Sequence, residues 1–257
     1  MKRQIVLFSF GVASFTVAWY LASLANPSFF PPPGDVVQSA YQLIVAPDVD
    51  GNTALYHLWA SLVRIGIITA VALTISIVLG IAMGSVTSIE TPMSNLIPFW
   101  MALPPLVIIL FSMTLLGFTE QTIIIAVLVA TTPYGVVNVW KGTKNIDPDL
   151  LEMGDVFGVS RFSMWRNIYF PAVLPYLFST GRYLFSMIWK VTMLAEVFGV
   201  DRGIGARVRF WFDQADLTLL LAYFFIFFVT LLLIEYGIIA QLEKRAFKWR
   251  PESESTI

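Results

Sequence analysis

Cysteine is absent from the 257 residues, and histidine occurs once, as His57. The chain therefore has no disulfide, no thiolate metal ligand and no cysteine nucleophile. A single histidine cannot make a zinc site by itself, so we expect no bound metal and interpret His57 as an interfacial side chain.

Charge is also scarce. Only 13% of the residues are charged while 57% are hydrophobic, and the mean hydropathy of +0.76 lies outside the range of ordinary soluble domains. The net charge of -1, without clustered lysine and arginine, argues against a nucleic-acid partner. The lipid bilayer is the expected surrounding of this chain.

Motifs for chemistry are missing as well. The sequence has no H-E-x-x-H, no G-x-S-x-G and no Cys/His dyad, so we expect that it is not an enzyme. It also has no G-x-x-x-x-G-K-[ST] phosphate loop, so it cannot hydrolyse ATP in that manner by itself.

Long apolar runs are what the sequence has. Because about 20 apolar residues cross a bilayer, we predict an all-α membrane protein with six transmembrane helices in one domain over residues 1–257. The expected spans are residues 5–25, 65–86, 96–117, 122–140, 172–198 and 217–241. Pro104, Pro105 and Pro133 interrupt two spans, and the carbonyls they leave unpaired must be satisfied by neighbouring helices or water. Residues 26–56 form a polar loop with a short surface helix over 35–45.

The first apolar run raises the question of a cleaved signal peptide. It covers 21 residues from Ile5 to Ala25, longer than the usual signal core of about 7 to 15 residues. We therefore expect a retained anchor, with cleavage as the alternative.

Lysine and arginine in the loops predict the orientation. With the N-terminus in the cytoplasm, three outer residues, Arg202, Arg207 and Arg209, stand against a larger cytoplasmic set: Lys2, Arg3, Lys141, Lys144, Arg161, Arg166, Lys244, Arg245, Lys248 and Arg250. Both termini are then cytoplasmic, as is the loop of residues 141–171.

This loop has the pattern of two short amphipathic helices. Asp147 is an expected N-cap with Pro148 following, and Gly158 is an expected left-handed end. Ser160 caps the second helix, which ends where Pro171 opens the next span. The apolar faces are Leu150, Met153 and Phe157 on the first helix and Phe162, Trp165 and Tyr169 on the second. Amphipathicity alone favours packing on the bundle or in the lipid interface.

The spacing of residues in this loop instead favours contact with a partner protein. Glu152-Met153-Gly154, three residues, Gly158, nine residues and Ile168-Tyr169-Phe170-Pro171 resemble the EAA loop of ABC importer permeases. Met153, Gly154 and Phe170 depart from that pattern in size. The resemblance implies that Asp147 to Pro171 form a coupling helix that docks on a cytoplasmic ATPase subunit.

Further motifs are similar to the nitrate, sulfonate and taurine permease group of this family. They are Ser61-Leu62-Val63-Arg64, Gly80 and Gly84, Pro104-Pro105-Leu106, Ala195-Glu196 and Gly203-Ile204-Gly205. The resemblance implies a type I ABC importer permease fold in the cell inner membrane. The implied partners are two ABC ATPase subunits that bind the ATP, a second permease copy forming a homodimer, and a solute-binding protein. The permease itself is expected to hold no cofactor.

Charged and polar residues in the fifth span indicate a path for the solute. Charges within a membrane span tend to face an interior or a cavity, and Arg182, Ser186, Lys190 and Glu196 are the candidates. A cation such as Lys190 suits an anionic solute. Interhelical pairing, or snorkelling of Arg182, explains the same residues without a transport role. An ATP-independent secondary transporter or channel is the rival function, although it gives the aromatic loop no purpose.

Overall fold

The computed structural model describes residues 2–26 and 29–241, in which every regular element is helical. This confirms the predicted all-α class. The polar tail, residues 242–257, lies outside the described residues, as do the four basic residues that it was expected to place in the cytoplasm. The chain divides into two compact units. Unit 1 combines Met1–Ser61 with Asp201–Leu231, and unit 2 combines Leu62–Val200 with Leu232–Ile257. The expectation of a single domain stays a prediction.

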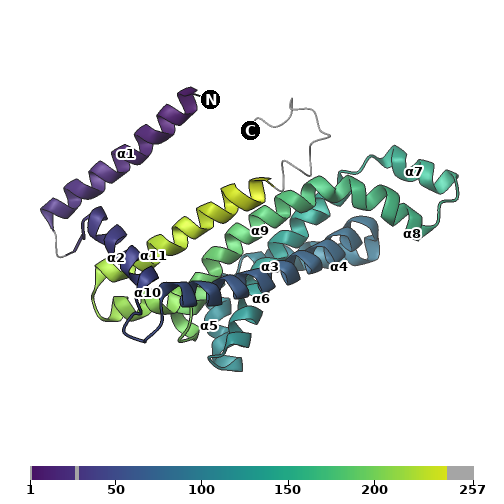
Figure 1. Ribbon diagram of the computed structural model, residues 1–257. Coiled ribbons are helices and arrows are strands. Elements are labelled where there is room, and N and C mark those ends of the chain that lie inside the picture. Colours follow the sequence, from purple (N-terminus) through teal and green to yellow (C-terminus); the bar gives the residue numbers. More distant parts are fainter. Residues whose placement is uncertain (1, 27–28, 242–257) are drawn as a thin grey trace. The chain divides into compact units, whose positions relative to one another are not determined.

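Unit 2 is a helical bundle. Its main helices are α3 (Ala54–Ser85, from Leu62 onward), α4 (Thr87–Met101), α5 (Pro105–Leu116), α6 (Glu120–Lys144) and α9 (Phe170–Gly199). Helices α6 and α9 run side by side along most of their length (Figure 1). The core joins α3, α6 and α9 through Ile81, Val139, Val173 and Leu177, all buried.

Glycines let α3 approach α6 closely. A Cβ added to Gly80 would lie 2.6 Å from the Cβ of Val139, and one added to Gly84 would overlap Thr143. Helices in lipid gain stability from such close packing of small residues. The Gly80 to Gly84 pair therefore packs two spans together, as a G-x-x-x-G motif does.

The third expected span is broken. Helices α4 and α5 meet at 93° across Ala102–Pro104, because proline lacks an N–H and restricts the residue before it. The break falls at the predicted prolines, but residues 87–95, which the sequence reading left outside the spans, are already helical in α4.

A second proline has the predicted consequence. Pro133 lies inside α6 and has no N–H for the carbonyl of Val129, one turn earlier. The indole Nε1 of Trp100 on α4 donates to that carbonyl at 3.1 Å. A neighbouring helix thus satisfies the group that the proline leaves unpaired.

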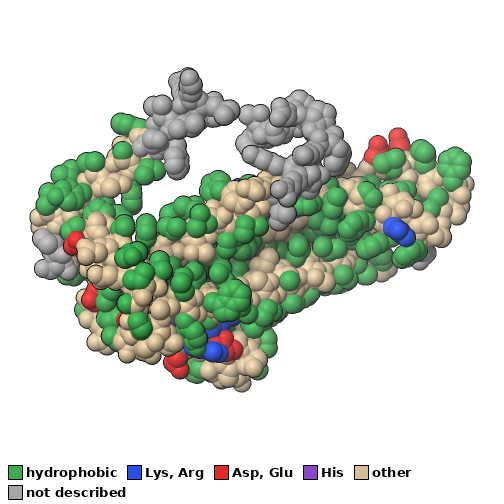
Figure 2. All heavy atoms as spheres, in the orientation of Figure 1, with side chains coloured by type: hydrophobic (Ala, Val, Ile, Leu, Met, Phe, Trp, Pro, Cys, Tyr) green, Lys and Arg blue, Asp and Glu red, His purple; other side chains and the backbone are tan. Residues whose placement is uncertain are grey.

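Three described helices are long and apolar enough to cross a membrane: Ala54–Ser85, Glu120–Lys144 and Leu217–Ile239. Two further helix pairs, α4 with α5 and Phe162–Gly199 with Ile204–Asp213, qualify when each pair is taken as one broken span. Hydrophobic side chains are spread over the face seen in Figure 2, among few charged ones. The structure thus supports up to five spans, and the sixth stays a prediction.

Unit 1 contains α1 (Lys2–Ala25), α2 (Pro33–Val45), the start of α3, α10 (Ile204–Asp213) and α11 (Leu217–Leu232). Helix α2 is the short helix predicted in the first loop, and it buries Val36, Ala40 and Leu43. The indole Nε1 of Trp19 donates to the carbonyl of Pro31 at 3.0 Å, which ties α1 to the segment before α2.

Candidate functional site

The connection between α6 and α9 begins with the predicted capped helix. Helix α7 covers Pro148–Val156, and the Asp147 carboxylate accepts a hydrogen bond from the Asp149 N–H at 3.0 Å. Gly158 has a φ of 64°, the left-handed conformation that glycine adopts without strain. These local predictions are confirmed.

The second helix differs from the prediction. Ser160 caps it, accepting from the Ser163 N–H at 3.2 Å, but helix α8 (Arg161–Met164) does not end before the span. A π-helical turn, η1 (Trp165–Tyr169), carries it directly into α9. Pro171 cannot donate to the carbonyl of Asn167 in α-helical register, which accounts for a wider turn at this place. The second helix is therefore the first part of α9.

The apolar side chains of this connection are exposed. We call the α7–α8 segment with its exposed apolar side chains the tip; it lies at one end of α6 and α9 (Figure 1). Phe157 and Phe162 are 77% and 71% exposed, and Leu150, Met153 and Trp165 are exposed too. Figure 2 shows hydrophobic side chains at this end beside acidic ones. No described residue covers these side chains, so packing on the bundle does not explain them.

The opposite side of the tip anchors it. Gly154 is buried against Met164, and Ile168 and Tyr169 are half-buried against the core of unit 2. The prediction that Tyr169 shares the exposed face was wrong, because the π turn rotates it toward the core. Glu152 is exposed on the tip, and Pro171 is exposed at the start of α9.

The four candidate path residues have different surroundings on α9. Lys190 is exposed and Ser186 is half-buried. Arg182 forms an ion pair with Glu235 at 3.3 Å, whereas the fully buried Glu196 is paired with Arg64. The interhelical pairing that the sequence left open thus occurs for both Arg182 and Glu196.

The Arg64 cluster consists of Arg64 on α3, Glu120 at the start of α6 and Glu196 near the end of α9. The Arg64 Nε and Nη2 donate to the two Glu120 oxygens at 2.5 and 2.7 Å, and Nη1 donates to Glu196. The side chains of Arg64 and Glu196 are 4% and 0% exposed, while that of Glu120 is 34% exposed. The cluster therefore joins three helices at the end of α6 opposite the tip.

Sequence reasoning missed this cluster. In the sequence, Arg64 stands out only as part of a family-like motif and Glu196 also as a candidate path residue, neither with a named partner, and Glu120 carries no prediction. The available signal was the cost of a charge inside an apolar helix, which requires a partner. That cost does not name the partner, because Glu120 and Glu196 lie 56 and 132 positions away in the sequence.

Unit 1 has its own polar centre at Asp48, in the loop after α2. Its carboxylate accepts from Arg207 at 2.5 Å, Trp211 at 3.1 Å and Tyr223 at 2.6 Å. Burial raises the pKa of Asp48, but hydrogen bonds from Tyr223, the Val49 N–H and Arg207 outweigh it and hold the pKa below its usual value. This centre fastens the loop to α10 and α11.

His57 belongs to the same region of unit 1. It is buried, its Nε2 lies 2.8 Å from the Asp50 carboxylate, and its Nδ1 accepts from the Gly203 N–H at 3.4 Å. His57 is thus buried beside a carboxylate inside unit 1, and its position at the membrane interface stays a prediction.

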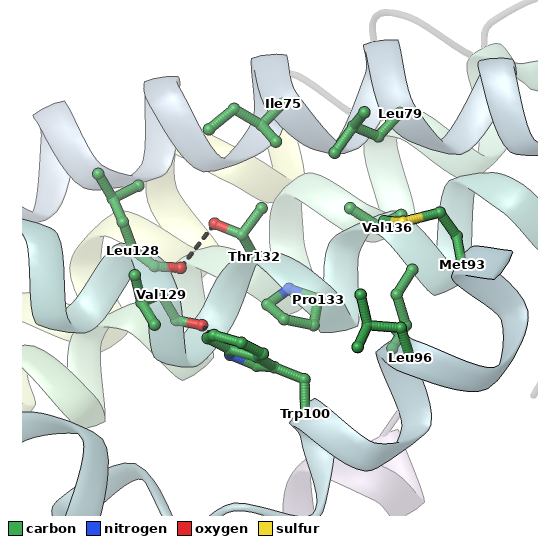
Figure 3. A pocket seen from close by; sticks show the side chains of 11 residues that line it. Ile75, Leu79, Met93, Leu96, Trp100, Leu128, Val129, Thr132, Pro133 and Val136 are labelled. Carbon is green, nitrogen blue, oxygen red and sulfur yellow. Dashed lines mark hydrogen bonds between the residues drawn. The ribbon is translucent and has the colours of Figure 1, made fainter. Parts of the chain in front are cut away.

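An apolar groove of about 290 Å³ lies in unit 2 among α3, α4 and α6. Figure 3 shows its lining, in which the Thr132 hydroxyl donates to the Leu128 carbonyl at 2.7 Å and Trp100 is bonded to Val129. Its polar groups already have backbone partners, so the groove offers no site for an ion. The remaining lining residues are Ile75, Leu79, Met93, Leu96, Ile97, Pro133 and Val136.

Comparison with known proteins matches the larger part of the chain to one protein family. The model of the family described as binding-protein-dependent transport system inner membrane component matches residues 72–248. The chain is 25% identical over 256 residues to the taurine transport system permease protein TauC of Escherichia coli (strain K12), covering 98% of this chain and 92% of TauC. It is 26% identical over 198 residues to the nitrate import permease protein NrtB of Synechocystis sp., covering 76% and 72%. A shorter match, 31% over 105 residues, is to the putative aliphatic sulfonates transport permease protein SsuC of E. coli (strain K12), covering 41% and 38%.

Proposed function

Since the chain belongs to the family of binding-protein-dependent transport system inner membrane components, we propose that it is the permease subunit of an ATP-driven importer of a small anionic solute. Its relatives are named as permeases for taurine, nitrate and aliphatic sulfonates, and each of these solutes carries an oxyanion. The solute crosses the inner membrane, and partner subunits hydrolyse the ATP.

The exposed apolar tip is the observation that carries this proposal. Phe157 and Phe162 project from a capped, glycine-ended turn between two spans, where water-exposed aromatic rings are costly. A cleft on a cytoplasmic ABC ATPase covers them. The contact residues are Asp147, Leu150, Glu152, Met153, Phe157, Gly158, Phe162 and Trp165, while Ile168 and Pro171 hold the tip to α9.

The continuity of α8, η1 and α9 provides the mechanical link. A force on the tip acts directly on α9, the helix that carries Glu196 near its end, because residues 161–199 are continuously helical. Closure of two ATPases on ATP binding then moves α9 and changes the side to which the bundle opens. Two permease copies and an outer solute-binding protein complete the assembly.

The orientation follows from the same assignment. The tip lies on the cytoplasmic side with both termini, and the Arg64 cluster lies toward the outside. Lys190 and Ser186 on α9 line the solute path. Lys190→Met is then expected to lower the rate of anion uptake, and uptake at the parental rate would remove that role.

Co-purification from native membranes tests the function. A tagged chain should bring down a protein that mass spectrometry identifies by its phosphate-loop motif and that hydrolyses ATP. Gly158→Leu should lose this protein, because leucine is strained at a φ of 64° and reshapes the tip. Gly51→Leu is the matched control, since Gly51 has a φ of 79° in unit 1, outside the tip. Both variants retaining the ATPase equally would refute the assignment of the tip, and no ATPase with the parent chain would favour a secondary transporter or channel.

A further inference from the structure

The Arg64 cluster contains one guanidinium and two carboxylates of unequal exposure. Glu196 is 0% exposed and accepts from Nη1. Glu120 is 34% exposed and takes the whole Nε–Nη2 edge of the guanidinium. The fixed pair is therefore Arg64 with Glu196, and the accessible pair is Arg64 with Glu120.

The Nε–Nη2 edge has the geometry that suits any anion with two acceptor oxygens. Two parallel N–H donors match a carboxylate, a sulfonate or a nitrate equally, whereas a spherical ion such as chloride meets them with a single atom. Glu120 fills this edge in the structure with donor–acceptor distances of 2.5 and 2.7 Å.

We propose that Arg64 is a binding residue for the transported anion, which displaces Glu120 from the Nε–Nη2 edge. A monoanion that replaces the Glu120 carboxylate leaves the charge next to Arg64 unchanged, and the buried pair with Glu196 stays intact. Glu120 is the first residue of α6, so its side chain turns to water without any change in the helix. The choice of an anionic solute rests on the proposed function.

A purely structural cluster would hold the three helices together and bind nothing. The absence of cysteine from the chain allows a direct test, because Glu120→Cys introduces the only thiol. The rate at which N-ethylmaleimide labels this thiol is measured on the full-length chain in nanodiscs. The rate in methanesulfonate is compared with the rate in chloride at equal ionic strength. A cation lowers a neighbouring thiol pKa, so an anion bound to Arg64 both covers this thiol and removes its activation.

The expected result is that methanesulfonate slows labelling of Glu120→Cys by about tenfold relative to chloride. Gln121→Cys is the matched control, exposed one residue further on, and should react equally in both salts. Arg64→Lys combined with Glu120→Cys should lose the protection, since lysine offers no planar edge. Equal rates for Glu120→Cys in both salts, or equal slowing at Gln121→Cys, would overturn the proposal. If the double variant does not fold, these two single variants still decide.

Displacement of the native carboxylate needs a second measurement. Methanesulfonate should raise the melting temperature of the parent chain above that in chloride. In the Glu120→Gln variant, half of this rise in melting temperature should be reached at a methanesulfonate concentration about tenfold lower than in the parent chain, because the competing carboxylate is gone. A parent chain that melts identically in both salts refutes displacement.

The labelling experiment tests the anion site independently of the proposed function, because it uses the chain without an ATPase. Protection without ATPase co-purification would leave the anion site standing and remove the importer assignment. Co-purification without protection would remove the anion site alone.

Discussion

Replacing Arg64 with methionine is expected to be far more damaging than replacing either of its partners. The cluster holds two carboxylates for one guanidinium, so replacing Arg64 removes the cation that is paired with Glu196, which is 0% exposed, and leaves the two carboxylates of the cluster without it. Breaking a buried ion pair from one side costs about 3–5 kcal/mol. Glu196→Gln leaves Arg64 neutralised by Glu120 and keeps a carbonyl acceptor for Nη1, so its cost is about 1 kcal/mol.

The double variant gives the sharper result. Arg64→Met combined with Glu196→Gln removes both charges of the buried pair, so it should be more stable than Arg64→Met alone by about 2 kcal/mol. The measurement is the free energy of unfolding from SDS titration of the purified chain in mixed micelles, followed by circular dichroism.

A matched control comes from an exposed pair on α10. Arg209 bonds Asp213 four residues later at 2.7 Å, with both side chains nearly half exposed. Arg209→Met should therefore change stability by about 0.5 kcal/mol or less. If Arg64→Met cost no more than this control, or if Glu196→Gln failed to rescue it, the account of the cluster as a buried ion pair would be wrong.

Three other expectations follow from the same structure. Phe157→Ala should leave the stability of the chain unchanged, since the ring is 77% exposed. It should weaken the affinity of the chain for the ATPase, measured by a binding titration, by about tenfold. Gly142→Ala should lower the free energy of unfolding by about 1–3 kcal/mol in the same SDS titration, because the added Cβ would lie 2.5 Å from the Tyr176 ring. Gly66→Ala is the control: its Cβ meets open space, so the substitution should be neutral or slightly stabilising. The pKa of Asp48 is lowered in the fold, so its contribution is present above the unfolded pKa of about 3.9 and is lost as pH falls through the folded value. The stability gap between the parent and Asp48→Asn should then stay constant from neutral pH to about pH 5 and close in stronger acid.

Local structure was the predictable part of this chain. The effects of a cap, a first-turn proline and a helix-ending glycine extend only one or two helical turns, as at Asp147, Pro148 and Gly158. The structure therefore has the cap and the left-handed end at the predicted residues. The same holds for Gly80, whose spacing to Gly84 marks a face for close packing.

Distant pairing and helix continuity were not predictable in the same way. The sequence shows that Arg64 needs a counter-charge, but the packing of three helices selects Glu120 and Glu196 from all acidic residues. The π turn before Pro171 depends on how α9 packs, and it decides that Tyr169 faces the core. A helical pattern with 3.6 residues per turn cannot show such a local change of pitch.

The indole of Trp100 stands in for a peptide N–H that Pro133 lacks. Its hydrogen-bonding role exists only as long as position 133 is proline. In an alignment of homologous sequences, loss of this proline should remove the selection for a donor at position 100, so the two positions should covary although they are 33 positions apart in the chain.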